Sequence, residues 1–438
     1  MSLDQALVRR LREEAADILA RQRRDDAASG MPPMTSEDER QFARAVISRV
    51  LDAHARTEMA AGRTPPNPAE EEEISGGIHA ALYGVGRLQP LLDDPDVENV
   101  DINGCDQVFV QYADGREERL PAIADSDDEL VELVQTLGAY SGLTSRPFDS
   151  ANPELDLRLP DGSRLSAVKD VCARPSISIR RARLSRVHLE DLVRLGSVTP
   201  ELAAFFSAAI GARKNIMIAG ATNAGKTTLL RALANEIVPQ ERIITVERAL
   251  ELGLGEFADL HPNVLAFEER LPNSEGVGSI TMADLVRRSL RMNPSRVIVG
   301  EVLGDEIVTM LNAMSQGNDG SLSTIHANSS MEVFNRIATY AIQSAERLPV
   351  EASMMLIAGA IDFVVFVQKS NDYSVGGRLR RFVHSVREVN GVDGRVLSSE
   401  IFAPGVDGVG EPAAPIACLR DLEEVGYAPT YGMVGPAA

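Results

Sequence analysis

The sequence predicts an α/β fold, and three observations support this prediction. The 438-residue chain is 44% hydrophobic and 25% charged, a globular composition, and it is long enough for two or three domains. From about residue 199 to residue 368, short apolar runs alternate with helical patterns, which is typical of a mainly parallel sheet covered by helices. Before this region, residues 84–186 alternate between apolar and polar side chains and contain Asn-Gly and Asp-Gly turns, which predicts a smaller α+β domain.

Residues 1–73 are predicted to form a helical N-terminal domain and a linker. Apolar residues recur at helical spacing in residues 3–24, and Ser36 followed by Glu39 is a capping signature for a second helix. Residues 64–73, TPPNPAEEEE, have the composition of a linker, in which four consecutive glutamates indicate a solvated stretch.

Residues 74–186 and 187–438 are predicted to be the α+β domain and the larger α/β domain. In the α+β domain, turns are expected at Asn103-Gly104, Asp114-Gly115 and Asp161-Gly162. In the larger domain, strands are expected at residues 215–219, 242–246, 297–300 and 323–327. The apolar stretch Met355–Val367, interrupted by Asp362, is too short to cross a bilayer and is interpreted as a buried strand. Residues after Pro404 are rich in Gly and Pro and are expected to be loosely ordered.

The charge and the cysteine content argue against several classes of protein. A formal net charge of -20 disfavours broad, sequence-independent binding of nucleic acid, which needs a basic surface. Cys105, Cys172 and Cys418 lie far apart and lack CxxC spacing, so we expect neither a zinc ribbon nor a disulfide framework, and a reducing cytoplasm fits. The first helical segment carries arginines and acids throughout, so no signal peptide is expected.

Residues 216–230, IMIAGATNAGKTTLL, contain the phosphate-loop pattern GxxxxGK followed by threonine. An expected strand precedes the pattern and an expected helix, Lys226–Ile237, follows it, which is the context that the motif requires. Backbone amides and the helix N-terminus of such a loop surround a polyphosphate, so residues at the turn must be small. We expect Lys226 to contact the β- and γ-phosphates of ATP, and Thr227 to bind Mg²⁺. The predicted nucleotide-binding residues of the loop are Gly220, Ala221, Thr222, Asn223, Ala224, Gly225, Lys226, Thr227 and Thr228.

Asn223 occupies a loop position at which glycine could adopt positive φ. Asparagine is among the residues that best tolerate this region, at a cost of about 1 kcal/mol. We therefore expect the loop to form with asparagine in this position.

Three polar side chains follow strands of the predicted sheet, at the point where each strand ends. They are Glu247, Glu301 and His326, and Glu301 follows Gly300, which stands where many P-loop enzymes have aspartate. Because parallel strands end at one edge of the sheet, we expect the three side chains to face one crevice. A carboxylate there can activate the attacking water or bind Mg²⁺, and a histidine can sense the γ-phosphate. We prefer Glu301 as the group that activates water, with Glu247 as the alternative.

With these motifs, residues from about Leu91 to Phe402 resemble the ATPases of the type II/type IV secretion superfamily, and most of all the CpaF/TadA type that serves tight-adherence pili. The motifs that carry the resemblance are LLDDPDVENVDINGCDQVFV, LPDGSR, SISIRR, LGSVTPELAAFF, the phosphate loop, TVERALEL, EERLPNSEGVGSIT, LRMNPSRVIVGE and GSLSTIHAN. The helical N-terminal region also resembles the small helical domain of this type.

The resemblance implies an ATP-hydrolysing enzyme with a RecA-like motor domain that assembles as a homohexameric ring. It implies that Arg164 and Arg180 of the α+β domain reach the phosphates, as suits guanidinium groups, and that Glu247, Glu301 and Thr227 act on Mg²⁺ and water. It also implies a cytoplasmic protein that reaches the membrane only through an integral-membrane platform protein and powers pilus assembly or protein secretion. Two alternatives stay open: an ATP-binding ring scaffold with little hydrolysis, and a DNA-translocating conjugation motor.

Four positions depart from the pattern of this superfamily. Leu303 stands where arginine is usual, Asp305 where glycine is usual, and Asn318 where histidine is usual; Arg248 stands where aspartate is common. An arginine lost near a subunit boundary removes a charge-assisted contact that leucine cannot replace. We therefore expect a working ATPase whose turnover can be slow.

Overall fold

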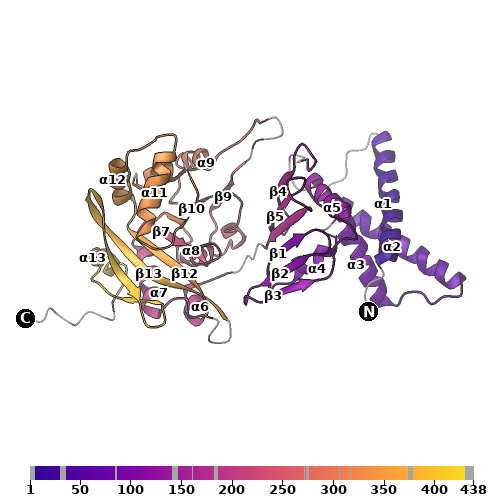
Figure 1. The fold of residues 1–438 in the computed structure, drawn as a ribbon, viewed down its shortest axis with the longest axis horizontal. Coiled ribbons are helices and arrows are strands. Elements are labelled where there is room, and N and C mark those ends of the chain that lie inside the picture. The colour runs from indigo at the N-terminus through magenta and orange to yellow at the C-terminus, as the bar shows by residue number, and fades with distance from the viewer. Residues whose placement is uncertain are drawn as a thin grey trace, which may run out of the picture. The chain divides into compact units, whose positions relative to one another are not determined.

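The computed structural model divides into two compact units, Met1–Arg183 and Leu184–Ala438 (Figure 1). The described residues are 5–29, 36–83, 86–140, 147–159, 161–181, 186–270, 272, 276–304, 306–315, 317–372 and 378–429. The finer division into three domains, with boundaries after residues 73 and 186, stays a prediction.

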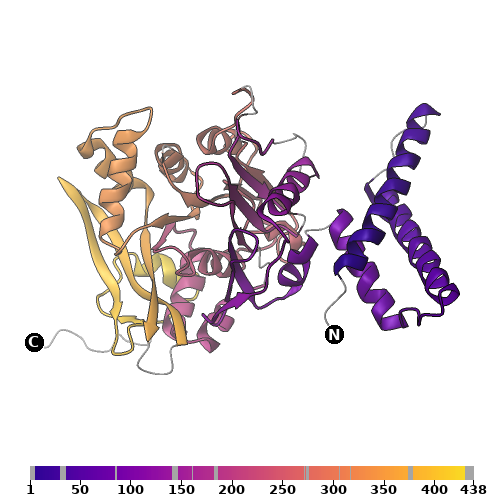
Figure 2. The same ribbon diagram turned by 45° about the vertical axis from the view of Figure 1, so that its right-hand side comes forward.

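Three helices pack against one another at the start of the first unit (Figure 2). They are α1 (Gln5–Ala28), α2 (Ser36–Ala60) and α3 (Pro68–Tyr83). The predicted linker is wrong from Pro68 onward, because Asn67 and Glu70 form a capping box that begins α3. The Asn67 side chain accepts hydrogen bonds from the amides of Ala69 and Glu70, and the Asn67 amide donates to the Glu70 carboxylate. Glutamates in the first turn also suit the positive end of the helix dipole.

The rest of the first unit contains a six-stranded antiparallel sheet in the order β3-β2-β1-β6-β5-β4. Its strands are β1 (Val97–Asn103), β2 (Val108–Tyr112), β3 (Glu117–Leu120), β4 (Glu154–Arg158), β5 (Arg164–Val168) and β6 (Ser176–Arg180). Its helical elements are η1 (Gly86–Leu88), α4 (Gln89–Asp93) and α5 (Asp127–Tyr140). The three predicted turns are confirmed, since Gly104, Gly115 and Gly162 all have positive φ between paired strands. Leucine, valine and isoleucine side chains of α5 and one sheet face form the core.

The second unit is built around a nine-stranded sheet in the order β15-β14-β13-β12-β7-β11-β10-β8-β9. The strands are β7 (Ile216–Gly220), β8 (Ile243–Glu247), β9 (Val264–Glu268), β10 (Arg296–Val302), β11 (Leu322–His326), β12 (Phe363–Asp372), β13 (Arg378–Asp393), β14 (Arg395–Pro404) and β15 (Gly410–Pro412). The six strands from β12 to β9 are parallel, whereas β12 to β15 pair in antiparallel fashion. The predicted α/β fold, with a mainly parallel sheet following an α+β domain, is confirmed.

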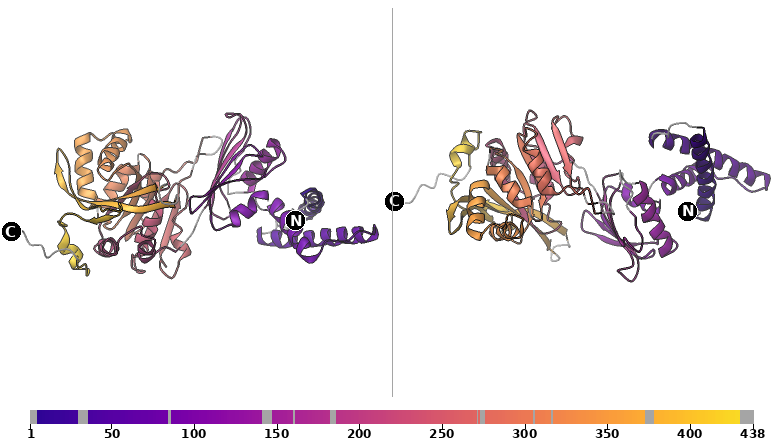
Figure 3. Two further views of the ribbon diagram at one scale, coloured as in Figure 1. Left: turned by 60° about the horizontal axis from the view of Figure 1, so that its bottom comes forward. Right: turned by 90° about the horizontal axis from the view of Figure 1, so that it is seen from above.

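Helices cover both faces of this sheet (Figure 3). One face packs on α6 (Leu189–Arg194), α7 (Pro200–Gly211), α8 (Lys226–Ala234) and α13 (Leu419–Glu423). The other packs on α9 (Met282–Ser289), α10 (Glu306–Ser315), α11 (Glu332–Gln343) and α12 (Val350–Ala360). A short 3-10 helix, η2 (Leu254–Glu256), lies between β8 and β9. Both faces of the central strands are therefore buried, which explains why these strands are apolar without alternation.

Two predictions for the C-terminal region are wrong. The apolar stretch Met355–Val367 is not one strand: α12 ends at Ala360 and β12 begins at Phe363, with Asp362 between them accepting a hydrogen bond from the amide of Asn215 at 2.8 Å. The residues after Pro404 are ordered as far as the description extends, because they form β15 and α13 and pack into the apolar core. Within the described ranges, no helix has the length and apolarity to cross a membrane.

Candidate nucleotide site

The phosphate loop connects the buried strand β7 to helix α8. Asn223 has a φ of 59° and Gly225, the N-cap of α8, has a φ of 98°. The expectation that Asn223 adopts a positive φ is confirmed. The loop thus has the left-handed turns that let successive backbone amides face an anion at the helix N-terminus.

Lys226 points across the loop toward the ends of neighbouring strands. Its ammonium group lies 3.2 Å from the carbonyl oxygen of Gly220 and 3.1 Å from that of Ala221. It also lies 3.2 Å from Nδ1 of His326 and 3.7 Å from Oε1 of Glu301. Only 7% of Lys226 is exposed. The structure therefore brings together three of the predicted residues, Lys226, Glu301 and His326.

The contacts of His326 define its protonation. Because an ammonium group only donates, Nδ1 of His326 accepts from Lys226, and Nε2 carries the proton and donates to Oε1 of Glu301 at 2.9 Å. Burial, followed by the positive charge of Lys226, lowers the pKa of His326, and the nearby Glu301 only partly opposes this. The imidazole is therefore neutral at pH 7, and its contact with Glu301 is a hydrogen bond rather than an ion pair.

Glu247 has different surroundings from Glu301. It is 3% exposed, and its Oε2 accepts hydrogen bonds from the amides of Glu251 and Leu252 at 2.7 and 2.8 Å. Its Oε1 accepts from the hydroxyl of Thr245 at 3.3 Å. Burial raises the pKa of Glu247, although these hydrogen bonds oppose the shift. The carboxylate thus binds its own connecting loop.

Gly300 explains how Glu247 is accommodated. A Cβ atom at residue 300 would lie 2.9 Å from Cγ of Glu247, which is closer than van der Waals contact allows. The glycine that replaces the usual aspartate therefore leaves the space that the Glu247 side chain fills. The sequence showed the departure but not this reason for it.

Arg231 connects the loop around Glu247 to helix α8. Its guanidinium donates to the carbonyl oxygens of Glu251 and Leu252, the same two residues whose amides bind Glu247. Burial lowers the pKa of Arg231. Sequence reasoning missed this residue, because its partners lie 20 and 21 positions away and no local pattern marks them.

Thr227 and Thr228 begin helix α8, where Thr227 is half-buried and Thr228 is exposed. In the part of the chain that the structure describes, no group of three or more His, Cys, Asp or Glu side chains could hold a metal ion. A metal bound here would take its ligands from a hydroxyl, a carboxylate and phosphates. This donor set fits Mg²⁺, which is usually held by few protein groups together with substrate phosphates and water.

Two of the departures from the superfamily pattern, Asn318 and Arg248, make side-chain contacts, whereas Leu303 contributes its backbone amide. The amides of Leu303 and Gly304 donate to the buried Glu306 carboxylate at 2.6 and 3.2 Å. The side-chain amide of Asn318 donates to the carbonyl of Ala313 at 3.3 Å, near the end of α10. Arg248 pairs with Glu269 at 3.0 Å. Asp305 lies outside the described residues.

Arg164 and Arg180 lie directly opposite each other on β5 and β6 of the first unit. Arg158 on β4 lies opposite Arg164, so three arginines form a row across three strands. Adjacent like charges on one sheet face are unfavourable unless an anion accompanies them. Sequence reasoning missed Arg158, although the equal spacing of Arg158 and Arg164 around the Asp161-Gly162 turn could have identified it.

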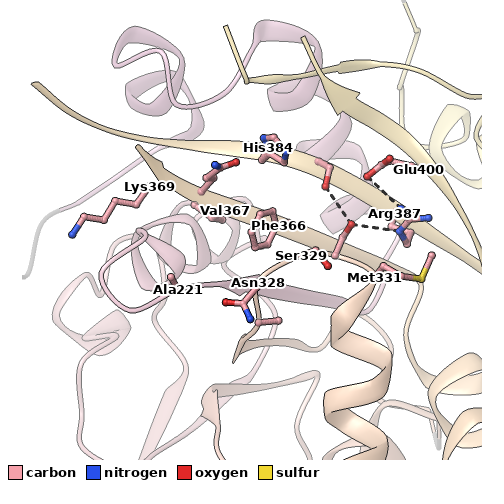
Figure 4. A pocket seen from close by; sticks show the side chains of 14 residues that line it. Ala221, Asn328, Ser329, Met331, Phe366, Val367, Lys369, His384, Arg387 and Glu400 are labelled. Carbon is pink, nitrogen blue, oxygen red and sulfur yellow. Dashed lines mark hydrogen bonds and ion pairs between the residues drawn. The ribbon is translucent and has the colours of Figure 1, made fainter. Parts of the chain in front are cut away.

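A cavity of about 490 Å³ lies beside the phosphate loop (Figure 4). Its walls come from the β11–α11 connection and from β12, β13 and β14, and Ala221 is its phosphate-loop residue. At one end, Arg387 binds the Ser330 hydroxyl and pairs with Glu400 at 3.3 Å. Since Lys226 and Glu301 do not line it, this cavity is separate from the contacts described above.

Residues 83–372 match the family model described as Type II/IV secretion system protein, so the chain belongs to this family. The chain is 36% identical over 265 residues to a putative conjugal transfer protein of Mycobacterium tuberculosis (strain H37Rv), covering 58% of this chain and 72% of the relative. It is 32% identical over 308 residues to the type IV secretion system protein VirB11 of Brucella suis, covering 64% and 83%. The prediction of an ATP-hydrolysing P-loop enzyme is confirmed by its membership of this family.

The solved structures that the chain resembles include two ATPases. The crystal structure of the Brucella suis VirB11 ATPase in complex with sulphate has 29% identity and a TM-score of 0.36, covering 68% of this chain and 91% of that chain. The Legionella pneumophila ATPase DotB has 19% identity and a TM-score of 0.49, covering 68% and 78%.

Proposed function

We propose that this chain is the motor ATPase of a pilus-assembly or protein-secretion machine, of the CpaF/TadA tight-adherence type, and that it works as a homohexameric ring. The observation that carries the proposal is the meeting of Lys226, Glu301 and His326 beside the phosphate loop, at the carboxyl ends of adjacent parallel strands. The match of the family model over residues 83–372 supports it.

In the proposed reaction, Glu301 accepts a proton from the water that attacks the γ-phosphorus of ATP, and ADP leaves with the bond to the γ-phosphate broken. Glu301 suits this role because 36% of its side chain is exposed, so water can reach it. The burial of Glu247 supports giving that residue the role of positioning its loop. When ATP binds, the ammonium group of Lys226 would leave the loop carbonyls and His326 and contact the β- and γ-phosphates instead. His326 would then lose a hydrogen bond.

The Thr227 hydroxyl and Glu301, directly or through water, would hold Mg²⁺, which when bound neutralises charge on the phosphates. Arg164 and Arg180 would contact the same phosphates, with Arg158 beside them in the row. Arginine suits this task, because its planar guanidinium can bind two phosphate oxygens at once.

Phosphate release by the assembled full-length protein tests the enzyme site. Hydrolysis of ATP with Mg²⁺ is expected for the wild type and is expected to fall to background in Lys226→Ala, because the lysine supplies the charge on the β- and γ-phosphates. Equal rates of ATP hydrolysis in the wild type and in Lys226→Ala would contradict the assignment of the nucleotide site. Background rates in both would instead favour a ring scaffold that binds ATP without hydrolysing it. Light scattering of the same samples tests the hexamer.

The proposal also includes a partner protein in the membrane. We propose that the ring is cytoplasmic and reaches the inner face of the cell membrane through an integral-membrane platform protein. Co-purification with a multi-spanning membrane protein from the same cells, lost when that protein is absent, would support this arrangement. Recovery of the chain in the membrane fraction without any such protein would contradict it.

A conjugation motor is the second candidate, because one relative is a putative conjugal transfer protein. The net charge of -20 disfavours direct binding of DNA. Hydrolysis that rises on addition of DNA at low salt, and loses this stimulation steeply as salt increases, would favour the conjugation motor over the proposed function.

A further inference from the structure

The phosphate loop packs against two strands that lie far from it in the sequence. β12 is a parallel neighbour of β7, and a Cβ atom at Gly220 would lie only 2.5 Å from the carbonyl oxygen of Val367 on β12. β13 pairs with β12 and places Arg381 opposite Lys369. The β12–β13 pair therefore borders the loop, although more than 130 residues separate them along the chain.

Arg381 is a residue of this pair that binds the loop directly. Its Nε donates to the backbone oxygen of Asn223 at 3.0 Å, and its Nη2 donates to Oδ1 of Asn223 at 3.2 Å. Its Cδ lies 3.6 Å from the position that a Cβ atom at Gly225 would occupy. One side chain thus binds Asn223 and lies close to Gly225, the two loop residues that have positive φ.

This contact bears on the conformation of Asn223. Positive φ is unfavourable for a residue that has a Cβ atom, although least so for asparagine. Two charge-assisted hydrogen bonds, one to its backbone and one to its side chain, favour this conformation over others. Because the loop amides must face inward to bind a polyphosphate, a loop that is already in this conformation binds ATP more tightly.

We propose that Arg381 is a positioning residue for ATP binding, which keeps Asn223, and with it the phosphate loop, in the conformation that binds the nucleotide. The inference rests on the proposed nucleotide site. It accounts for asparagine in a position that glycine could fill, since Arg381 supplies by hydrogen bonding what glycine supplies by its conformational freedom. A direct contact of Arg381 with phosphate is a different hypothesis, which the following experiment separates.

Titration of the full-length protein with a fluorescent ATP analogue and Mg²⁺ tests the role of Arg381. Arg381→Met keeps the aliphatic stem and is expected to raise the Kd about five- to tenfold, with kcat changed less than about twofold. Arg380→Met is the matched control: this exposed neighbour donates to the carbonyl of Asp407 at 3.4 Å, and we expect no change in Kd. Lys226→Ala is expected to abolish binding, and if it does not, the nucleotide site itself is wrong.

Asn223→Gly is the variant that separates positioning from phosphate contact. Glycine adopts positive φ without help, so adding Arg381→Met to Asn223→Gly is expected to change the Kd by less than about twofold. If Arg381→Met raises the Kd as much in the Asn223→Gly protein as in the wild type, the proposal is overturned and a direct phosphate contact is favoured. An unchanged Kd in Arg381→Met alone would overturn it as well.

Thermal melting shows whether Arg381→Met is folded at the assay temperature. If it is unfolded there, Arg381→Lys replaces it, because lysine keeps the charge and the stem but cannot donate to both oxygens in a fixed geometry. The same rise in Kd, and the same suppression by Asn223→Gly, are then expected, and their absence counts against the proposal in the same way.

Discussion

Glu247 and Glu301 lie at the carboxyl ends of neighbouring parallel strands, but their carboxylates have opposite surroundings. Glu247 is buried and accepts hydrogen bonds from two amides and a hydroxyl. Glu301 is partly exposed, and its carboxylate contacts Lys226 and His326, which both belong to the candidate site. A carboxylate at the carboxyl end of a parallel strand lies at the edge of the sheet where ligands bind. The loop that follows the strand then determines whether this carboxylate faces solvent or protein.

Gly300 lies between these two environments. It leaves the space in which Cγ of Glu247 packs, and it precedes Glu301 on β10. A single missing side chain thus allows one glutamate to be buried beside the strand that carries the other. Two acids with the same sequence signature therefore have different surroundings, which favours different roles, and three substitutions can break or sharpen this contrast.

The largest expected effect is on hydrolysis. Glu301→Gln keeps the shape but removes the base, and we expect kcat for ATP to fall about 10²- to 10⁴-fold, with a much smaller change in ATP affinity. Glu247→Gln is the matched control, because glutamine can accept the same two amide hydrogen bonds, and its kcat is expected to stay within about tenfold of wild type. Steady-state phosphate release measures both. Intact turnover in Glu301→Gln together with loss of turnover in Glu247→Gln would reverse the assignment.

A smaller effect is expected on stability. Gly300→Ala adds a Cβ atom 2.9 Å from Cγ of Glu247, and the side chain must shift within a packed interior, at a cost of about 1–3 kcal/mol in the free energy of unfolding. Gly359→Ala is the control, because a Cβ atom there has no atom within 4 Å and lies in α12. Denaturant unfolding of both variants checks the prediction. Equal stability of Gly300→Ala and wild type would show that Glu247 does not need this space.

Local features of the fold and the site were predictable from the sequence. The phosphate loop, the strands on either side of it and the positive φ of Asn223 depend on short segments whose residue types limit the backbone. The proximity of Glu301 and His326 follows from the rule that parallel strands end at one edge, whereas Glu247, expected in the same crevice, binds its own connecting loop. These predictions needed no knowledge of contacts between distant residues.

Other features depended on contacts that the sequence does not display. The helix α12 and the strand β12 were read as one strand, because both are apolar and only their packing on different neighbours separates them. The contact of Arg381 with Asn223 joins residues 158 positions apart. The burial of Glu247 was equally hidden, since a glutamate at a strand end is ordinarily expected to be exposed.

The smallest expected effect concerns the pH dependence of stability. Burial raises the pKa of Glu247 in the folded protein, so the folded state binds this proton more strongly than the unfolded state does. The resulting stabilisation is fully present below the pKa of the unfolded state and is lost as the pH rises through the raised pKa. Glu247→Gln removes this titration, while its amide can still accept from the loop amides and donate to the Thr245 hydroxyl.

We therefore expect the melting temperature of Glu247→Gln to rise relative to wild type as the pH increases from about 4 to about 8, by up to a few degrees, since about 1 kcal/mol shifts the Tm of a large domain by 2–4 °C. The exposed Glu256→Gln, on the same connection, controls for the change in net charge. Melting curves across this pH range provide the measurement. If the difference in melting temperature between Glu247→Gln and wild type shrinks as the pH rises, the loop favours the ionised form of Glu247. Glu247 and Glu301 would then differ in exposure alone, and not in the energetic cost of carrying a charge.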